Sequence, residues 1–235
     1  MATDLHHVHQ HLFVTGTDTE IGKTLVSAAL LHAMQAQGWR AVGMKPVAAG
    51  ASLRDGVWHN EDVDTLMAAA NVAASQELVC PYLMQAPAAP HIVAALEKVD
   101  ITLPHILQCY QQLRAQADAV VVEGVGGFCV PLNTEVTTAD LAQALDLPVI
   151  MVVGVRLGCI NHALLTAEAI RARGLTLCGW VANTVDSSML YMDENINALR
   201  TRLAAPLLGH IPRLNVPEHQ KALSAASYLD LSVLK

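Results

Sequence analysis

The stretch that decides the fold is Phe13-Val14-Thr15-Gly16-Thr17-Asp18-Thr19-Glu20-Ile21-Gly22-Lys23-Thr24. Apolar residues before Gly16 predict a short buried strand, and the apolar pattern after Thr24 predicts a long helix. A glycine-bounded loop between a strand and a helix is typical of a phosphate-binding loop, because its backbone N–H groups and the helix N-terminus can face an anion. Lys23 can reach the β- and γ-phosphates, and the Thr24 hydroxyl can ligate Mg²⁺. We therefore expect a nucleoside triphosphate site rather than a chance Gly-Lys-Thr in an ordinary turn.

The composition limits the class of protein. The chain has 235 residues, of which 53% are hydrophobic and 15% charged, so it can build a large core, and we expect one domain over residues 1–235. The net charge of −7, with no long Lys/Arg cluster, argues against a nucleic-acid partner. The longest apolar run, around residues 149–153, is too short to cross a bilayer. Five cysteines without a CxxC pair predict reduced thiols and, with no secretion signal evident, a cytoplasmic location.

Residues 1–11 form a histidine-rich segment that precedes the first expected strand. His7, His9 and His11 would share one face of an extended chain and could then hold a metal. We expect a solvated leader instead, because chain ends of this kind are seldom tied down.

Strand and helix patterns alternate along the rest of the chain. Further strands are expected at residues 41–44, 119–122, 148–154, 177–182 and 206–211, and helices at 22–37, 60–70, 91–96, 103–117, 161–173 and 191–203. This alternation predicts an α/β fold with a doubly wound, mostly parallel sheet and helices on both faces.

Two charged residues stand where expected strands end. Lys45 follows the strand at 41–44, and Pro46 stops that strand. Glu123 follows a continuous β-branched strand and precedes glycines. Because open parallel sheets bind ligands at the carboxyl ends of their strands, Lys45 is a candidate catalytic residue and Glu123 a candidate Mg²⁺ ligand. A solvated lysine and a glutamate that merely starts a loop are the alternatives.

Two helix starts are further candidates. Asn60-Glu61-Asp62-Val63-Asp64 opens a helix, and one of its acids could face the magnesium ion or simply complement the helix dipole. The glycine turn at residues 158–161 meets a helix N-terminus, which suits an anion, although an ordinary loop is the default interpretation.

Together the motifs resemble the dethiobiotin synthetase family. They are VTGTDTEIGKT at 14–24, with five residues instead of the common four between its glycines, KPVA at 45–48, VEGVGG at 122–127, GCINH at 158–162 and GWVAN at 179–183. The resemblance implies ATP-dependent ring closure in biotin synthesis. One amine of 7,8-diaminopelargonate takes up CO2 as a carbamate, which accepts the γ-phosphate of ATP. The second amine then attacks the resulting carbamic-phosphoric anhydride and expels phosphate.

The resemblance also implies a role for each site residue. Lys45, Thr19 and Lys23 would lie at the reacting centre, and Thr24, Asp62 and Glu123 would hold Mg²⁺. ATP would contact Glu20, Ile21, Gly22, Lys23, Thr24, Leu25, Asp62, Glu123, Gly124, Val125, Gly126, Asn183, Thr184, Pro212, Arg213 and Leu214. The diamine would contact Lys45, Ala49, Gly158, Cys159, Ile160, Asn161 and Tyr191. The family is a homodimer in which the turn at 158–161 of one subunit binds the far carboxylate of the other subunit's substrate.

Two departures and two alternatives stay open. Ala49 and Ala89 stand where members of the family commonly carry hydroxyl residues. A P-loop ATPase switch of the partition or division-site type would carry an extra lysine where Thr17 stands, and no membrane-targeting tail is evident. An amidoligase that acts on a corrin acid would need a glutaminase domain, for which the chain has no room. The preference between ATP and CTP is not defined by the sequence.

Overall fold

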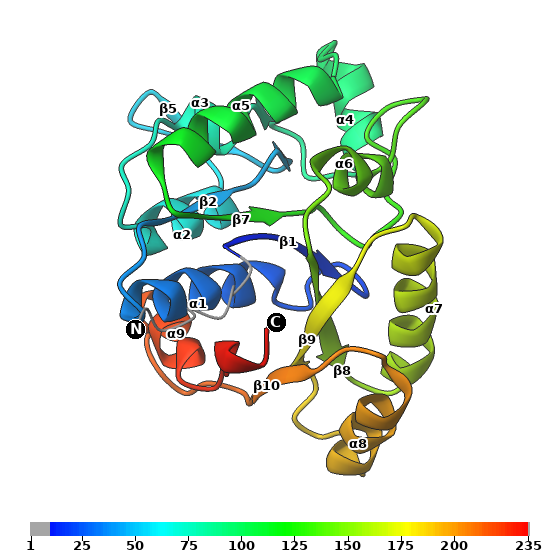
Figure 1. Cartoon of the computed structure of the whole chain (residues 1–235). Coiled ribbons are helices and arrows are strands. Elements are labelled where there is room, and N and C mark those ends of the chain that lie inside the picture. The colour runs from blue at the N-terminus through cyan, green and yellow to red at the C-terminus, as the bar shows by residue number, and fades with distance from the viewer. Residues whose placement is uncertain (1–9, 235) are drawn as a thin grey trace, which may run out of the picture.

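The structure is a computed structural model that describes residues 10–234 (Figure 1). The expected leader, with His6, His7 and His9, lies outside the described residues. The assignment of His11 to that leader is wrong, because His11 is the first residue of strand β1 (His11–Gly16). Its ring packs edge-on against Tyr110, with ring centroids 6.2 Å apart, which ties the start of the strand to helix α5.

The core of the fold is a six-stranded parallel sheet with the order β10-β9-β8-β1-β7-β2. Besides β1, this sheet contains β2 (Ala41–Met44), β7 (Ala119–Glu123), β8 (Val149–Val155), β9 (Leu177–Thr184) and β10 (Leu207–Ile211). The direction of winding reverses at β1, which pairs with β7 on one side and β8 on the other. Ligands bind at such a switch point, at the carboxyl ends of the strands, and the loop at residues 17–22 lies there.

Helices cover both faces of the sheet, as the sequence predicts (Figure 1). In β1, Leu12 and Val14 pack toward one face and Phe13 toward the other. The first face is covered by α1 (Lys23–Ala36), α2 (Glu61–Ala69) and α9 (Glu218–Ala226). The second face is covered by α4 (Pro90–Glu97), α5 (Leu103–Gln116), α6 (Thr138–Leu145), α7 (Cys159–Ala172) and α8 (Met192–Arg202). The described helices include none that is both long and apolar enough to cross a membrane.

Several short elements lie in segments that have no clear pattern in the sequence. They are β3 (Val47–Ala48), which pairs with β6 (Tyr82–Leu83), the antiparallel hairpin of β4 (Ser52–Arg54) and β5 (Val57–His59), α3 (Gln76–Val79), and the 3-10 helix Leu231–Val233. The longer helices α6 and α9 were also not predicted. The hairpin turns at Asp55-Gly56, where both residues have a positive φ, and its side chains are largely exposed. It lies outside the main sheet and leaves that sheet parallel.

Candidate active site

The phosphate loop joins β1 to α1 and depends on close backbone approach. A Cβ atom on Gly22 would lie 2.2 Å from Asn183 Nδ2, and one on Gly16 would lie 2.7 Å from Ile21 Cδ1. Gly22 has a φ of 87° and is the N-cap of α1, so the helix begins at Lys23 and not at Gly22. A side chain at either glycine would therefore push the loop out of shape.

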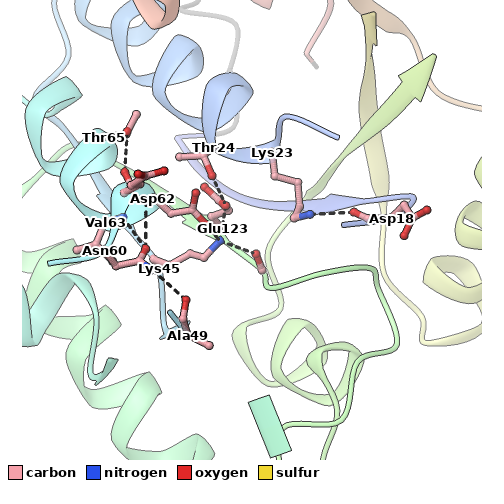
Figure 2. Close-up of polar contacts among 12 residues, drawn as sticks. Asp18, Lys23, Thr24, Lys45, Ala49, Asn60, Asp62, Val63, Thr65 and Glu123 are labelled. Carbon is pink, nitrogen blue, oxygen red and sulfur yellow. Dashed lines mark hydrogen bonds and ion pairs between the residues drawn. The ribbon is translucent and has the colours of Figure 1, made fainter. Parts of the chain in front are cut away.

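Lys23 folds back along its own loop. Its side chain is almost buried, and Nζ donates a hydrogen bond to the Asp18 carbonyl oxygen at 2.9 Å (Figure 2). Burial, and after it the nearby charge of Lys45, lower the pKa of Lys23 to about 8. The loop therefore carries an incompletely solvated ammonium group at the start of the helix, which a polyphosphate can pair with.

Lys45, Asp62, Glu123 and Thr24 form one connected cluster (Figure 2). Lys45 Nζ lies 2.5 Å from Glu123 Oε1 and 2.8 Å from Asp62 Oδ2, and Thr24 Oγ1 donates to Glu123 Oε1 at 2.9 Å. The Glu123 side chain is fully buried, whereas the Asp62 side chain is 44% exposed. Burial alone would lower the pKa of Lys45, but the two carboxylates reverse this and raise it above its ordinary value. The cluster thus holds a charged lysine beside the phosphate loop.

The cluster also has the chemistry of a magnesium site. Two carboxylates and a hydroxyl are the oxygen ligands that hard cations prefer. Among the residues that the structure describes, none offers a hydrogen bond to the buried Glu123 Oε2. An unsatisfied buried oxygen of this kind is costly, and a cation would satisfy it. Asp64, the other candidate acid, instead has both carboxylate oxygens 3.2 Å from His59 Nδ1.

Asn60 organises the approach to this cluster, although the sequence indicated it only as part of a motif. It is the N-cap of α2, and its Oδ1 accepts hydrogen bonds from the backbone of Asp62 and Val63 at 3.1 and 3.4 Å. Its Nδ2 donates to the Ala49 carbonyl oxygen at 3.0 Å. Asn60 therefore fixes both the acid at the helix start and the loop that follows Lys45. An asparagine before an acidic first turn is a common N-cap pattern, so this role was readable from the sequence.

A third group of predicted residues lies at the ends of β9 and β10. Asn183 Nδ2 donates to the Ile21 carbonyl oxygen at 2.8 Å, which brings β9 against the phosphate loop. Thr184 Oγ1 lies 2.8 Å from His210 Nε2, and residues 212–214 follow β10 directly. On the other side of the loop, the Thr19 hydroxyl is 3.5 Å from the position that a Cβ on Gly126 would occupy. Asn183 thus contacts the phosphate loop directly, and Thr184 and residues 212–214 lie at the ends of the paired strands β9 and β10.

The remaining predicted residues stand apart from Lys45. Gly158 has a φ of 94° and is the N-cap of α7, Cys159 is buried and Asn161 is exposed. Tyr191 has a φ of 56° and is the N-cap of α8. Within residues 10–234 no hydrogen bond or ion pair joins these residues to Lys45. An ion pair between Arg156 and Asp18, which no sequence pattern predicts, connects this turn to the phosphate loop.

A hollow of about 570 Å³ lies along α4, away from this cluster. It is lined by His91, Ile92, Ala94, Ala95, Leu96, Val99, Asn133 and Thr134. This lining is mostly apolar and carries no lysine or arginine to pair with a triphosphate. The nucleotide site is therefore assigned to the phosphate loop and not to this hollow.

The fold and the loop together define a P-loop nucleotide-binding protein. A family model described as an AAA domain matches residues 10–220. The chain is 59% identical over 226 residues, or 94% of each chain, to a protein of Janthinobacterium sp. (strain Marseille) named ATP-dependent dethiobiotin synthetase BioD. This chain belongs to the dethiobiotin synthetase family, as its motifs predict.

Solved structures confirm the fold class. The MinC:MinD cell division protein complex of Aquifex aeolicus matches with a TM-score of 0.56 at 13% identity, covering 93% of this chain and 94% of that one. A ParA family ATPase of Chlorobium tepidum TLS matches with a TM-score of 0.56 at 13% identity, covering 94% and 90%. At this identity the likeness is one of fold alone. The 59% identity to a synthetase therefore decides against the ATPase switch that the sequence left as an alternative.

Proposed function

We propose that this protein closes the ureido ring of dethiobiotin from 7,8-diaminopelargonate, CO2 and ATP, with Mg²⁺ bound at Thr24, Asp62 and Glu123. The observation that carries the proposal is the cluster of Lys45 with two acids beside the phosphate loop, in a chain that belongs to the synthetase family. Phosphoryl transfer needs positioning and charge neutralisation rather than a protein nucleophile, and this cluster offers both.

The steps assign a role to each group of the chain. One substrate amine attacks CO2 and loses a proton, which gives a carbamate whose negative charge Lys45 stabilises. A carbamate oxygen then attacks the γ-phosphorus, ADP leaves, and Lys23 and Thr19 hold the transferring phosphoryl group. The second amine attacks the carbamate carbon and loses a proton, and phosphate leaves as the ring closes. When bound, magnesium neutralises charge on the β- and γ-phosphates.

We also propose a homodimer with a substrate site shared between subunits. The turn at 158–161 has a glycine N-cap and an exposed Asn161, which suit the recognition of a carboxylate, but it stands apart from Lys45 in its own chain. Leu157, Leu190 and Tyr191 are large apolar side chains that are 89%, 78% and 73% exposed, which supports a partner subunit covering this region. All five cysteines are free, which supports a reducing, cytoplasmic location.

The decisive experiment measures phosphate release from ATP and Mg²⁺, with and without the diamine and bicarbonate. Release that requires both, together with incorporation of labelled bicarbonate into an acid-stable product, is the expected result. Phosphate release that does not depend on the diamine would contradict the synthetase activity and favour an ATPase switch. An unlabelled product formed at full rate would contradict the carboxylation step.

A further inference from the structure

Asp18 is the centre of a small set of contacts inside the phosphate loop. Its Oδ1 accepts a hydrogen bond from the Thr19 N–H at 2.8 Å. Its carbonyl oxygen accepts one from Lys23 Nζ at 2.9 Å (Figure 2). Its Oδ2 pairs with the Arg156 guanidinium. Asp18 thus contacts Thr19 and Lys23, which the proposed function places on the triphosphate. It also contacts Arg156, which follows strand β8.

Arg156 contacts the turn before α7 through its backbone and the phosphate loop through its side chain. Its carbonyl oxygen accepts a hydrogen bond from the Cys159 N–H at 3.0 Å, so its backbone forms the turn that leads into α7. Its side chain reaches across to Asp18, 138 residues away in the sequence. The neighbouring backbone is joined as well, because the Thr17 N–H donates to the Val152 carbonyl oxygen at 3.0 Å. The end of β8 is therefore the surface against which the first half of the loop rests.

We propose that Arg156 is a positioning residue of the nucleotide site, acting through Asp18 to hold the phosphate loop in its binding conformation. The inference rests on the proposed function only in that the loop binds the nucleotide. Without Arg156, the Asp18 carboxylate is free to turn away from the Thr19 N–H, and the backbone at Asp18, whose carbonyl oxygen holds Lys23, loses that restraint. The loop then has to be ordered when the nucleotide binds, which weakens binding.

A simpler role for Arg156 makes the opposite prediction at one position. If Arg156 only adds positive potential near the phosphates, removing the negative charge of Asp18 should tighten nucleotide binding. If Arg156 acts through Asp18, removing that charge should weaken binding. Asp18→Asn separates the two roles, because asparagine keeps an acceptor for the Thr19 N–H and loses only the pairing with Arg156.

The experiment measures the dissociation constant of ADP with Mg²⁺ by calorimetry for Arg156→Gln, Arg156→Lys, Asp18→Asn and the double variant Arg156→Gln/Asp18→Asn. The ion pair is 44% and 41% exposed, so the expected weakening is about two- to fivefold for Arg156→Gln and for Asp18→Asn. The double variant should be no weaker than the worse single variant, because both remove the same contact. Arg156→Lys should keep most of the affinity, since lysine restores a positive charge.

Arg173→Gln is the matched control. Arg173 also pairs with an aspartate, Asp140, at a similar exposure of 34% and 30%, but that pair lies at the start of α6. This variant should bind ADP like the wild type. Tighter binding by Asp18→Asn, or additive losses in the double variant, would overturn the proposal. Because ADP binding needs no diamine, a chain that makes no dethiobiotin would refute the proposed reaction without affecting this test.

Discussion

At the scale of single residues, the placement of Lys45 is the most consequential feature of the site. Its ammonium lies between the carboxylates of Glu123 and Asp62, and both Lys45 and Glu123 are withdrawn from solvent. Each charge is tolerated in the interior only because the other is present. Loss of the lysine therefore affects both the chemistry and the stability of the fold.

Lys45→Gln should lose most turnover while nucleotide affinity stays nearly intact, because in the proposed reaction Lys45 acts mainly on groups that develop charge in the transition state. Without Mg²⁺ the variant should also lose about 3–5 kcal/mol of unfolding free energy, since Glu123 is left buried without a counter-charge. Added Mg²⁺ should restore much of that stability. Steady-state kinetics, ADP binding and urea unfolding with and without EDTA measure the three effects, with Lys98→Gln, on an exposed lysine, as the control. Equal losses of nucleotide affinity and turnover would make Lys45 a binding residue instead.

Ala49→Ser should raise kcat/KM for the diamine several-fold. The Ala49 carbonyl oxygen accepts a hydrogen bond from Asn60 Nδ2 at 3.0 Å, so Ala49 is held in place in the loop that follows Lys45. A serine hydroxyl there could bind the carbamate or an amine, and one such hydrogen bond contributes about 1 kcal/mol. A kcat/KM that stays level or falls would mean that a water or another group already makes this contact.

At the scale of elements, Ala89 is the second position at which the chain departs from the family pattern, and it lies at the start of a helix. Ala89 is the N-cap of α4 and makes no capping hydrogen bond, and Pro90 occupies the first turn. Ala89→Ser should therefore stabilise the protein by about 1 kcal/mol and leave kcat/KM unchanged. Chemical denaturation and steady-state kinetics on the same preparation measure both quantities. A change in kcat/KM without a change in stability would instead place the hydroxyl in the substrate site.

Helix α6 begins with a capping box that depends on pH. Thr137 Oγ1 and the Thr137 N–H donate to Asp140 Oδ2 at 2.6 and 2.7 Å, and the Arg173 guanidinium also pairs with Asp140. The hydrogen bond from Thr137 and the charge of Arg173 lower the pKa of Asp140 from 3.8 to about 2. Because the folded state holds the proton more weakly, this stabilisation is complete well above pH 3.8 and is lost as the pH falls toward 2.

Asp140→Asn should therefore cost about 1 kcal/mol of unfolding free energy near neutral pH. The difference from the wild type should shrink as the pH is lowered through the window from 3.8 to about 2. Urea unfolding at a series of pH values measures this difference. A gap that stays constant down to the lowest pH would mean that Asp140 contributes by packing rather than by its charge.

The predictability of an element follows from its burial. Strands β7 and β8 are buried along their whole length, so each appears in the sequence as a continuous apolar run. The hairpin β4–β5 is short and its strands are largely exposed, which leaves no alternation to detect, although Asp55-Gly56 is a recognised turn signal. Helix α6 was missed despite Thr137 and Asp140, whose spacing is that of a capping box.

The same contrast holds for the site. The proximity of Lys45 and Glu123 could be predicted because Lys45 follows a recognisable strand, Glu123 ends another, and parallel strands bring their carboxyl ends to one edge. The pairing of Asp18 with Arg156 could not, because no spacing relates two loops that are 138 residues apart. Such a contact depends on how two turns lie above the sheet, which local sequence does not encode.

At the scale of the whole molecule, the chain places its phosphate loop at the switch point of the sheet and the turn at 158–161 just after the adjacent strand β8. The expectation of one domain stays a prediction, and so does the dimer. The two differ in their consequences, because only a dimer lets Lys45 of one chain and Asn161 of another serve the same substrate. The assembly can therefore be tested through activity.

Mixing inactive Lys45→Gln chains with inactive Asn161→Asp chains should restore activity if the site is shared. Asn161 is exposed at the start of α7, so an aspartate there should fold normally but repel the substrate carboxylate. In a mixed dimer one site then carries both substitutions and the other carries none. With random exchange, half of the dimers are mixed and half of their sites are intact, so about a quarter of wild-type activity is expected.

The control mixes Lys45→Gln with Lys23→Ala chains, whose substitutions affect the part of the site that one chain supplies, and it should restore nothing. Both mixtures are assayed after subunit exchange has been verified by mass spectrometry. If the Asn161→Asp mixture stays as inactive as the control, each chain completes its own site and the exposed turn at 158–161 has another role.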